Sequence, residues 1–133
     1  MCSVIPSAPG IVQVIVVNES ALELKWQPPA LTGDQTEVFY DVECRKPCVG
    51  EKNSICLDNN ESCGTDVIFK PKNDGLNTTC VTIGNLSSFV NYTMKIYARN
   101  RVSDLAKRKH GIEANFAAIT VRTNGPQVNK FVE

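Results

Sequence analysis

The sequence predicts an all-β chain folded as an antiparallel sandwich of two sheets and seven strands. Apolar and polar residues alternate in short segments, Pro, Gly, Asn or Ser bounds each segment, and no stretch keeps a helical period for three turns. Such alternation places one face of a strand on a core and the other in water. Because each of two sheets can cover the other's apolar face, a sandwich is the expected closed form.

Seven segments meet these criteria, and we expect strands at residues 12–16, 22–26, 38–44, 67–69, 81–83, 92–99 and 116–123. Pro28 and Pro29 end the second strand, since proline cannot donate to a sheet ladder. Ile119 and Val121 are expected to point inward from the last strand. The sixth strand has the clearest alternation, and its expected inward residues are Tyr92, Met94, Ile96 and Ala98.

Four large side chains are expected in the core: Trp26, Tyr40, Leu86 and Tyr92. Trp26 is the only tryptophan and occupies an inward position. Leu86 and Tyr92 lie six positions apart just before a strand, which matches a tyrosine corner, where the ring enters the core and the hydroxyl bonds back to the backbone. We interpret Trp26 and Tyr92 as core residues and not as ligand contacts.

Charge and hydropathy exclude several classes of partner. Lys and Arg total 14 and Asp and Glu total 14, so no net charge attracts nucleic acid or an anionic membrane. No apolar run reaches the roughly 20 residues that span a bilayer. The outward Phe39, Tyr97 and Arg99 are interpreted as ordinary exposed side chains, and the pattern does not indicate which face contacts a partner.

No signal-peptide pattern follows Met1, so the chain is either cytosolic or a piece of a secreted protein. Five N-glycosylation sequons favour the second alternative, because chance would give about one or two in this length. Four of them are expected in turns or loops and the fifth abuts the corner tyrosine: Asn18, Asn60, Asn77, Asn85 and, next to the tyrosine, Asn91.

Four clustered cysteines are expected to form two nested disulfides, Cys44 with Cys63 and Cys48 with Cys56. The expected strands 38–44 and 67–69 flank the cluster like the arms of a hairpin, in which facing residues have nearly constant index sums. The sums are 107 and 104 for the nested pairs, against 100 and 111 for the crossed pairs. Zinc is the alternative, but the spacing suits it poorly and no histidine lies nearby.

The remaining two cysteines, Cys2 and Cys80, are expected to be free thiols or joined to each other, with free thiols preferred. Cys80 is expected at an outward position of its strand, and Cys2 lies in the N-terminal tail.

No catalytic motif accompanies His110, the only histidine, so enzyme activity is not expected. His110 ends a basic run that begins at Lys107, within a long expected loop over residues 101–115. We interpret this run as a solvated loop tip, and the alternative is contact with sulfated glycans or anionic lipid headgroups.

Several motifs together resemble the fibronectin type III pattern over nearly the whole chain. They are Pro6-Ser7-Ala8-Pro9, then Leu22-Glu23-Leu24-Lys25-Trp26 with Pro28-Pro29, and Leu86 through Tyr92 to Asn100. A narrower resemblance to the ephrin (Eph) receptor tyrosine kinases is carried by Ile5 through Pro9, Cys63-Gly64, Asn91-Tyr92-Thr93, Val102-Ser103-Asp104-Leu105 and Phe116 through Val121. Arg101 stands where that family tends to have glycine, which indicates a divergent member.

The Eph resemblance implies a membrane receptor with an upstream ephrin-binding domain, a cysteine-rich region, two fibronectin-type domains, a transmembrane helix and a cytoplasmic kinase. Residues 1–5 would then end the cysteine-rich region, residues 6–124 would form the first fibronectin-type domain, and residues 125–133 would begin a linker. It also implies an extracellular spacer at the plasma membrane that supports receptor clustering and ephrin signalling.

The partners that this resemblance implies are neighbouring domains of the same chain and, weakly, other receptor ectodomains in cis. It implies no catalysis for this domain, and the residues themselves indicate no cofactor, metal or nucleic acid. The alternative is a ligand-binding or adhesion domain of another cell-surface receptor. A cytokine receptor is disfavoured, since the chain lacks the Trp-Ser-x-Trp-Ser string common in that class.

Overall fold

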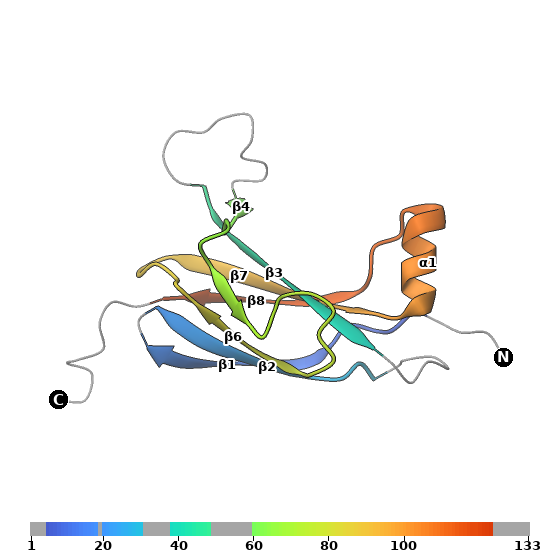
Figure 1. The fold of residues 1–133 in the computed structure, drawn as a ribbon, viewed down its shortest axis with the longest axis horizontal. Helices are drawn as coiled ribbons and strands as arrows, with labels where there is room; N and C mark the ends of the chain where they lie inside the picture. The colour runs from blue at the N-terminus through green and yellow to red at the C-terminus, as the bar shows by residue number, and fades with distance from the viewer. Residues whose placement is uncertain (1–4, 19, 31–37, 49–59, 124–133) are drawn as a thin grey trace.

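The structure, a computed structural model, describes residues 5–18, 20–30, 38–48 and 60–123. It confirms the predicted sandwich of two antiparallel sheets, each of four strands (Figure 1). One sheet has the order β1 (Gly10–Asn18), β2 (Ala21–Gln27), β6 (Cys80–Gly84) and β5 (Ile68–Lys70). The other has the order β4 (Asn60–Ser62), β3 (Phe39–Pro47), β7 (Asn91–Arg99) and β8 (Phe116–Arg122).

The described residues contain eight strands where the sequence predicted seven. The additional strand is β4, which pairs with an extension of β3 beyond Cys44, at Arg45↔Ser62, Lys46↔Glu61 and Pro47↔Asn60. Apart from Pro47, neither partner in this extension carries an apolar side chain, so alternation did not reveal it. Pairing there depends on backbone hydrogen bonds, which every residue except proline can donate.

Residues 101–110, expected in a loop, form the helix α1 (Arg101–His110). The Asn100 side chain accepts a hydrogen bond from the Ser103 backbone N–H at 2.9 Å, and the Ser103 hydroxyl accepts one from the Asn100 N–H at 2.8 Å. This reciprocal capping satisfies two of the backbone donors left free at a helix start. Gly111 ends the helix in the left-handed conformation, at φ 69°. The loop prediction was therefore wrong.

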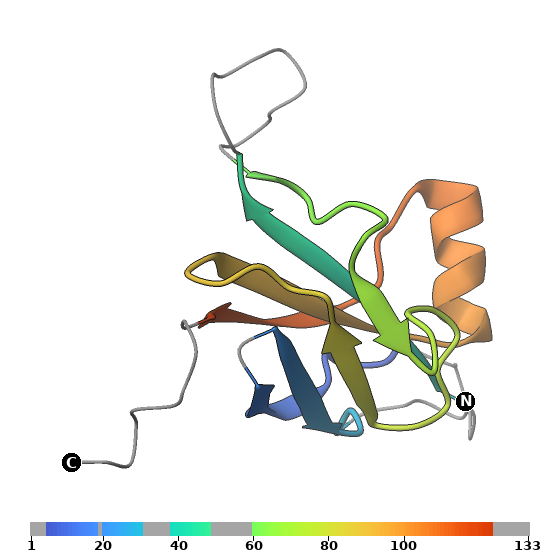
Figure 2. The same cartoon turned by 60° about the vertical axis from the view of Figure 1, so that its left-hand side comes forward.

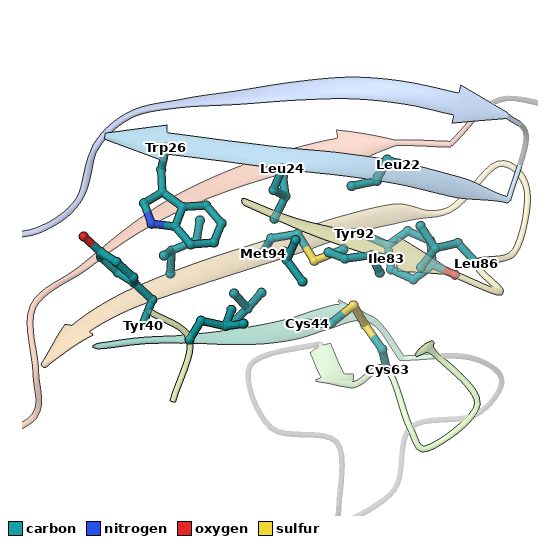
Figure 3. Packing of buried hydrophobic residues seen from close by; sticks show 14 of the residues in the cluster. Leu22, Leu24, Trp26, Tyr40, Cys44, Cys63, Ile83, Leu86, Tyr92 and Met94 are labelled. Atoms are coloured by element: carbon teal, nitrogen blue, oxygen red, sulfur yellow. A yellow bond between two sulfur atoms is a disulfide. The ribbon is translucent and has the colours of Figure 1, made fainter. Parts of the chain in front are cut away.

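The core lies between the two sheets, and all four predicted core residues belong to it (Figure 3). Trp26, Tyr40, Leu86 and Tyr92 are 3%, 4%, 5% and 2% exposed. The Trp26 and Tyr40 rings meet edge to face, with centroids 5.4 Å apart. The Tyr92 hydroxyl accepts a hydrogen bond from the Ser87 backbone N–H at 2.8 Å, which confirms the tyrosine corner.

The first and last described segments are bound to opposite ends of the sandwich. At one end the Asn115 side chain, just before β8, donates to the Pro6 carbonyl at 2.8 Å. At the other end the Thr123 hydroxyl, just after β8, donates to the Ser87 carbonyl at 2.6 Å. Both β1 and β8 begin on the side where α1 lies and end on the opposite side (Figures 1 and 2). Chain entry and chain exit are therefore separated by the length of the domain.

Candidate interaction surface

The outer face of the β3 and β7 pair, together with α1, gathers the polar and aromatic side chains of the second sheet. The inward residues of β3, such as Tyr40 and Val42, are buried, so Asp41 and Glu43 between them face outward. On β7 the outward Tyr97 lies opposite Asp41, and Arg99 lies opposite Phe39. We call this surface, completed by α1, the outer β3–β7 face.

An ion-pair network links three elements on this face. Arg99 on β7 contacts Asp41 on β3 at 3.0 Å and Asp104 in the first turn of α1 at 3.1 Å. Asp41 also accepts a hydrogen bond from the Gly75 backbone N–H at 2.9 Å. The three charged side chains are 30–42% exposed, so each ion pair contributes only ~0.2–1 kcal/mol. The network positions α1 against β7 more than it stabilises the fold.

Neighbouring carboxylates stabilise the charged form of Arg99. Burial of the guanidinium disfavours its charged form, but the hydrogen bond and the charge of Asp41, with those of Asp104, outweigh burial and raise the pKa of Arg99. Arg99 also lies over the ring of Phe39, with its guanidinium carbon 5.7 Å from the ring centroid. Arg99 is therefore a permanent cation that both carboxylates neutralise.

Tyr97 forms a second cluster beside this network. Its hydroxyl donates to Glu43 at 3.1 Å, its ring lies 5.1 Å from that of Phe116, and the Lys95 amine lies 5.1 Å over the Phe116 ring. Burial and the Glu43 charge raise the pKa of Tyr97 to about 12. The hydroxyl thus stays protonated at neutral pH and cannot act there as a base or nucleophile.

An open cavity of about 420 Å³ lies between β3, β7 and α1. Most of its charged groups are paired within the face: Arg99 with two aspartates, and Lys107 with Glu113 at 3.5 Å. Its charged lining residues are Asp41, Glu43, Asp74, Asp104, Glu113, Arg99 and Lys107. Among the described residues no group of three His, Cys, Asp or Glu is placed to hold a metal ion.

The outward aromatic and basic residues differ from their sequence interpretation. Phe39, Tyr97 and Arg99 were interpreted as ordinary exposed side chains, whereas the structure places all three half-buried on one face. The sequence carried no signal for this grouping, because Asp41 and Arg99 are 58 positions apart and meet only through the pairing of β3 with β7.

The predicted pair Cys44 and Cys63 forms a disulfide at the edge of the core (Figure 3). These two thiols are therefore not zinc ligands. Cys48 is also disulfide-bonded, and its predicted partner Cys56 lies outside the described residues. Cys80 is exposed and free, as preferred from the sequence, whereas Cys2 lies outside the described part of the chain.

The hairpin that carries the disulfide differs from the predicted one. The expected arms, residues 38–44 and 67–69, belong to different sheets, because β5 (Ile68–Lys70) pairs with β6. The actual arms are β3 and β4, whose paired residues all have the index sum 107. Cys44 and Cys63 have the same sum and continue this register.

The sequons occupy different positions in the fold. Asn77, Asn85 and Asn91 are exposed, and Asn91 is the first residue of β7. Asn18 ends β1 and Asn60 begins β4, so these two lie at strand ends and not in the expected turns. The side-chain amide of Asn85 donates to the Asp66 carbonyl at 2.8 Å, which engages one of the two N–H groups on the nitrogen that a glycan would modify.

The fold belongs to a known family. A family model, the fibronectin type III domain, matches residues 7–112, and the chain belongs to this family. Solved structures agree at the level of the fold. The FN5 domain of Drosophila Lar has a TM-score of 0.53 at 16% identity, and the alignment covers 91% of this chain and 99% of that one. The twitchin kinase region from C. elegans has a TM-score of 0.58 at 20% identity, over 92% of this chain and 17% of that one.

Curated relatives relate the chain to a narrower group within the fibronectin type III family, the ephrin receptors. The chain is 40% identical to ephrin type-A receptor 6 of Homo sapiens over 123 residues, which are 92% of this chain and 11% of the receptor. It is 39% identical to ephrin type-A receptor 3 of Danio rerio over 107 residues, 79% of this chain and 10% of that receptor. The chain thus spans about a tenth of the length of these relatives. In the described residues no helix is long and apolar enough to cross a membrane.

Proposed function

We propose that the chain is an extracellular spacer and interaction module of an ephrin-receptor-type tyrosine kinase, with no catalysis of its own. In this proposal it separates neighbouring domains of a plasma-membrane receptor and supports receptor clustering and ephrin signalling. Ephrin would be bound mainly by an upstream domain. The identity to ephrin type-A receptors over most of the chain supports this assignment.

The separation of chain entry from chain exit is the observation that carries the spacer role. Pro6 is bound at the start of β8 and Thr123 at its end, and β8 has seven residues, a length of about 23 Å. Hydrogen bonds join both segments to the body of the sandwich. Domains attached before and after it would therefore be held apart by a stiff unit.

The outer β3–β7 face is the surface that we propose for weak contacts with other receptor ectodomains in cis. Its cavity is open, and its ion pairs are partly solvated and satisfied within the domain. Small transient contacts of under about 1,200 Å² seldom hold without a second attachment site. A receptor array would supply that second site through its other domains.

The extracellular placement rests on the disulfides and the sequons. Disulfides such as Cys44–Cys63 persist in oxidising compartments, which include the cell exterior. The sequons Asn77, Asn85 and Asn91 lie exposed, as glycan addition requires.

Sedimentation of the 133-residue chain at rising concentration tests the spacer and clustering role. We expect a monomer with at most weak, concentration-dependent self-association. A tight, obligate dimer would contradict the proposal, because a dedicated partner surface would then exist on this one domain. High-affinity capture of a soluble ligand by the isolated chain would instead favour the adhesion or ligand-binding alternative.

A further inference from the structure

One side of α1 presents cations to solvent. Arg101, Leu105 and Arg108 are spaced by four and three residues, so they line one side of the helix, and all three are exposed. The opposite side carries Ser103, which is buried in the capping interaction. The C-terminal half of α1 projects away from both sheets (Figure 1). This exposed side, with the neighbouring Lys109, is the α1 basic side.

The positive charge of the α1 basic side is not balanced locally. The nearby carboxylates are occupied, since Asp104 pairs with Arg99 and Glu113 pairs with Lys107. In the part of the chain that the structure describes, no salt bridge involves Arg101, Arg108 or Lys109. Of the four Lys and Arg residues on this short helix, three therefore have no salt bridge among the described residues, in a chain whose formal net charge is zero.

Helix stability does not explain all of these cations. Basic residues in the last turn, such as Arg108 and Lys109, interact favourably with the negative end of the helix dipole. Arg101 occupies the first position of the helix, where the dipole is positive and disfavours a cation. The helix dipole therefore does not explain a cation at Arg101, whereas an anionic ligand that neutralises the guanidinium does.

The spacing of the two arginines fits an extended polyanion. Arg101 and Arg108 lie seven residues apart, which is about 10 Å along the helix axis. A guanidinium can donate two parallel hydrogen bonds to one oxyanion group. Helices that insert into lipid present a broad apolar face, whereas the α1 basic side has only Leu105, with Ile112 just past the helix end. The chemistry thus favours a hydrophilic anionic chain over a lipid surface.

We propose that the α1 basic side binds a linear sulfated glycan, with Arg101 and Arg108 contacting successive sulfate groups along the helix. This inference goes beyond the spacer role and does not depend on it, because the site lies on the surface of the domain and needs no second receptor. The two proposals also have different readouts, self-association for one and glycan affinity for the other.

Titration of the 133-residue chain with a size-defined heparin oligosaccharide tests the site. The double variant Arg101→Gln with Arg108→Gln should bind about twofold to thirtyfold more weakly, since it removes two exposed ionic contacts. A matched control replaces Lys25 and Lys70 with glutamine, because both are exposed on the other sheet and the change in net charge is the same. We expect this control to keep the wild-type affinity, and a circular dichroism spectrum of each variant checks that it is folded.

Several results would overturn the inference. No measurable heparin binding by the wild type, or equal losses in the two double variants, would show that α1 is not a specific site. Equal affinity for hyaluronan, which has carboxylates but no sulfates, would contradict the sulfate assignment. Binding to phosphatidylserine vesicles without binding to heparin would identify a lipid surface instead. Selective loss in the α1 variant, with heparin preferred over hyaluronan, would support the proposal.

Discussion

Arg99 lies between two carboxylates that come from different elements of the fold. Asp41 reaches it across the sheet from β3, and Asp104 reaches it from α1. Sequence alternation predicted correctly that Arg99 points outward, but alternation describes one strand at a time. The contacts of Arg99 depend on the register that places it opposite Phe39 and on helix α1, where the sequence predicted a loop.

Tyr97 provides a direct test of the electrostatics on the outer β3–β7 face. Its pKa is raised to about 12, from an ordinary value near 10, by burial and by the Glu43 carboxylate. A raised pKa means that the folded state favours the neutral hydroxyl, so this contribution to stability is present below pH 10 and is lost as the pH rises toward 12.

The measurement is an alkaline titration of tyrosinate absorbance in the folded chain, with Tyr97→Phe subtracted from the wild type. We expect the difference curve to have its midpoint near pH 12. Glu43→Gln should shift that midpoint downward, because it removes the negative charge next to the hydroxyl. A midpoint near pH 10 in the wild type would contradict the packing of Tyr97 described above.

At the level of elements, the sequence predicted strands well where core and surface residues alternate regularly along the strand, and poorly elsewhere. The strands β2 and β7 alternate between core and surface along their length, and their segments were predicted nearly to the residue. The short strand β4 has no apolar side chain, so only its backbone pairing reveals it. Helix α1 has fewer than three turns, too few for a periodic signal, although Asn100 before it and Gly111 after it are typical of helix ends.

The disulfide Cys44–Cys63 should stabilise the hairpin of β3 and β4. It closes a loop over a sequence separation of 19, for which the chain-entropy estimate is about 3 kcal/mol. The double variant Cys44→Ala with Cys63→Ala should lower the free energy of unfolding in urea by an amount of this order. Cys80→Ala is the control, because that thiol is exposed and free and should leave the unfolding midpoint nearly unchanged.

Peptide mapping without reduction completes this test. We expect one linked fragment that contains Cys44 and Cys63 and a second that contains Cys48 and Cys56. The register of β3 and β4 supports the first pair directly. Cys48 is also disulfide-bonded in the structure, and its pairing with Cys56 rests on the index sums. A fragment that joins Cys48 to any cysteine other than Cys56 would refute the nested pairing.

At the scale of the whole molecule, the sequence was sufficient for the fold and insufficient for the surface. The sandwich, its core and its family follow from residue alternation and from motifs. Each of these signals lies within one continuous stretch of the sequence. The outer β3–β7 face depends on which segments the fold brings together, and the α1 basic side depends on residues 101–110 forming a helix where a loop was expected. The basic run from Lys107 was visible in the sequence, but its alignment with Arg101 on one side of a helix was not.

Passage of the whole chain through a secretory pathway is the last expectation that can be tested. Expression in a secreting eukaryotic cell should add mass that a glycosidase removes, because exposed sequons are present. Asn77 is exposed and should be well occupied. Asn85 should be less occupied, since its amide already donates to the Asp66 carbonyl at 2.8 Å and its backbone is held at φ 62°.

Mass spectrometry of the secreted chain separates these two sites. Asn77→Gln should remove more glycan mass than Asn85→Gln, and each variant serves as the control for the other because both remove one exposed sequon. Higher occupancy at Asn85 would show that the hydrogen bond to Asp66 does not limit modification. Secretion of a chain with no glycan at any sequon would contradict the extracellular assignment, since accessible acceptors in that pathway are ordinarily modified.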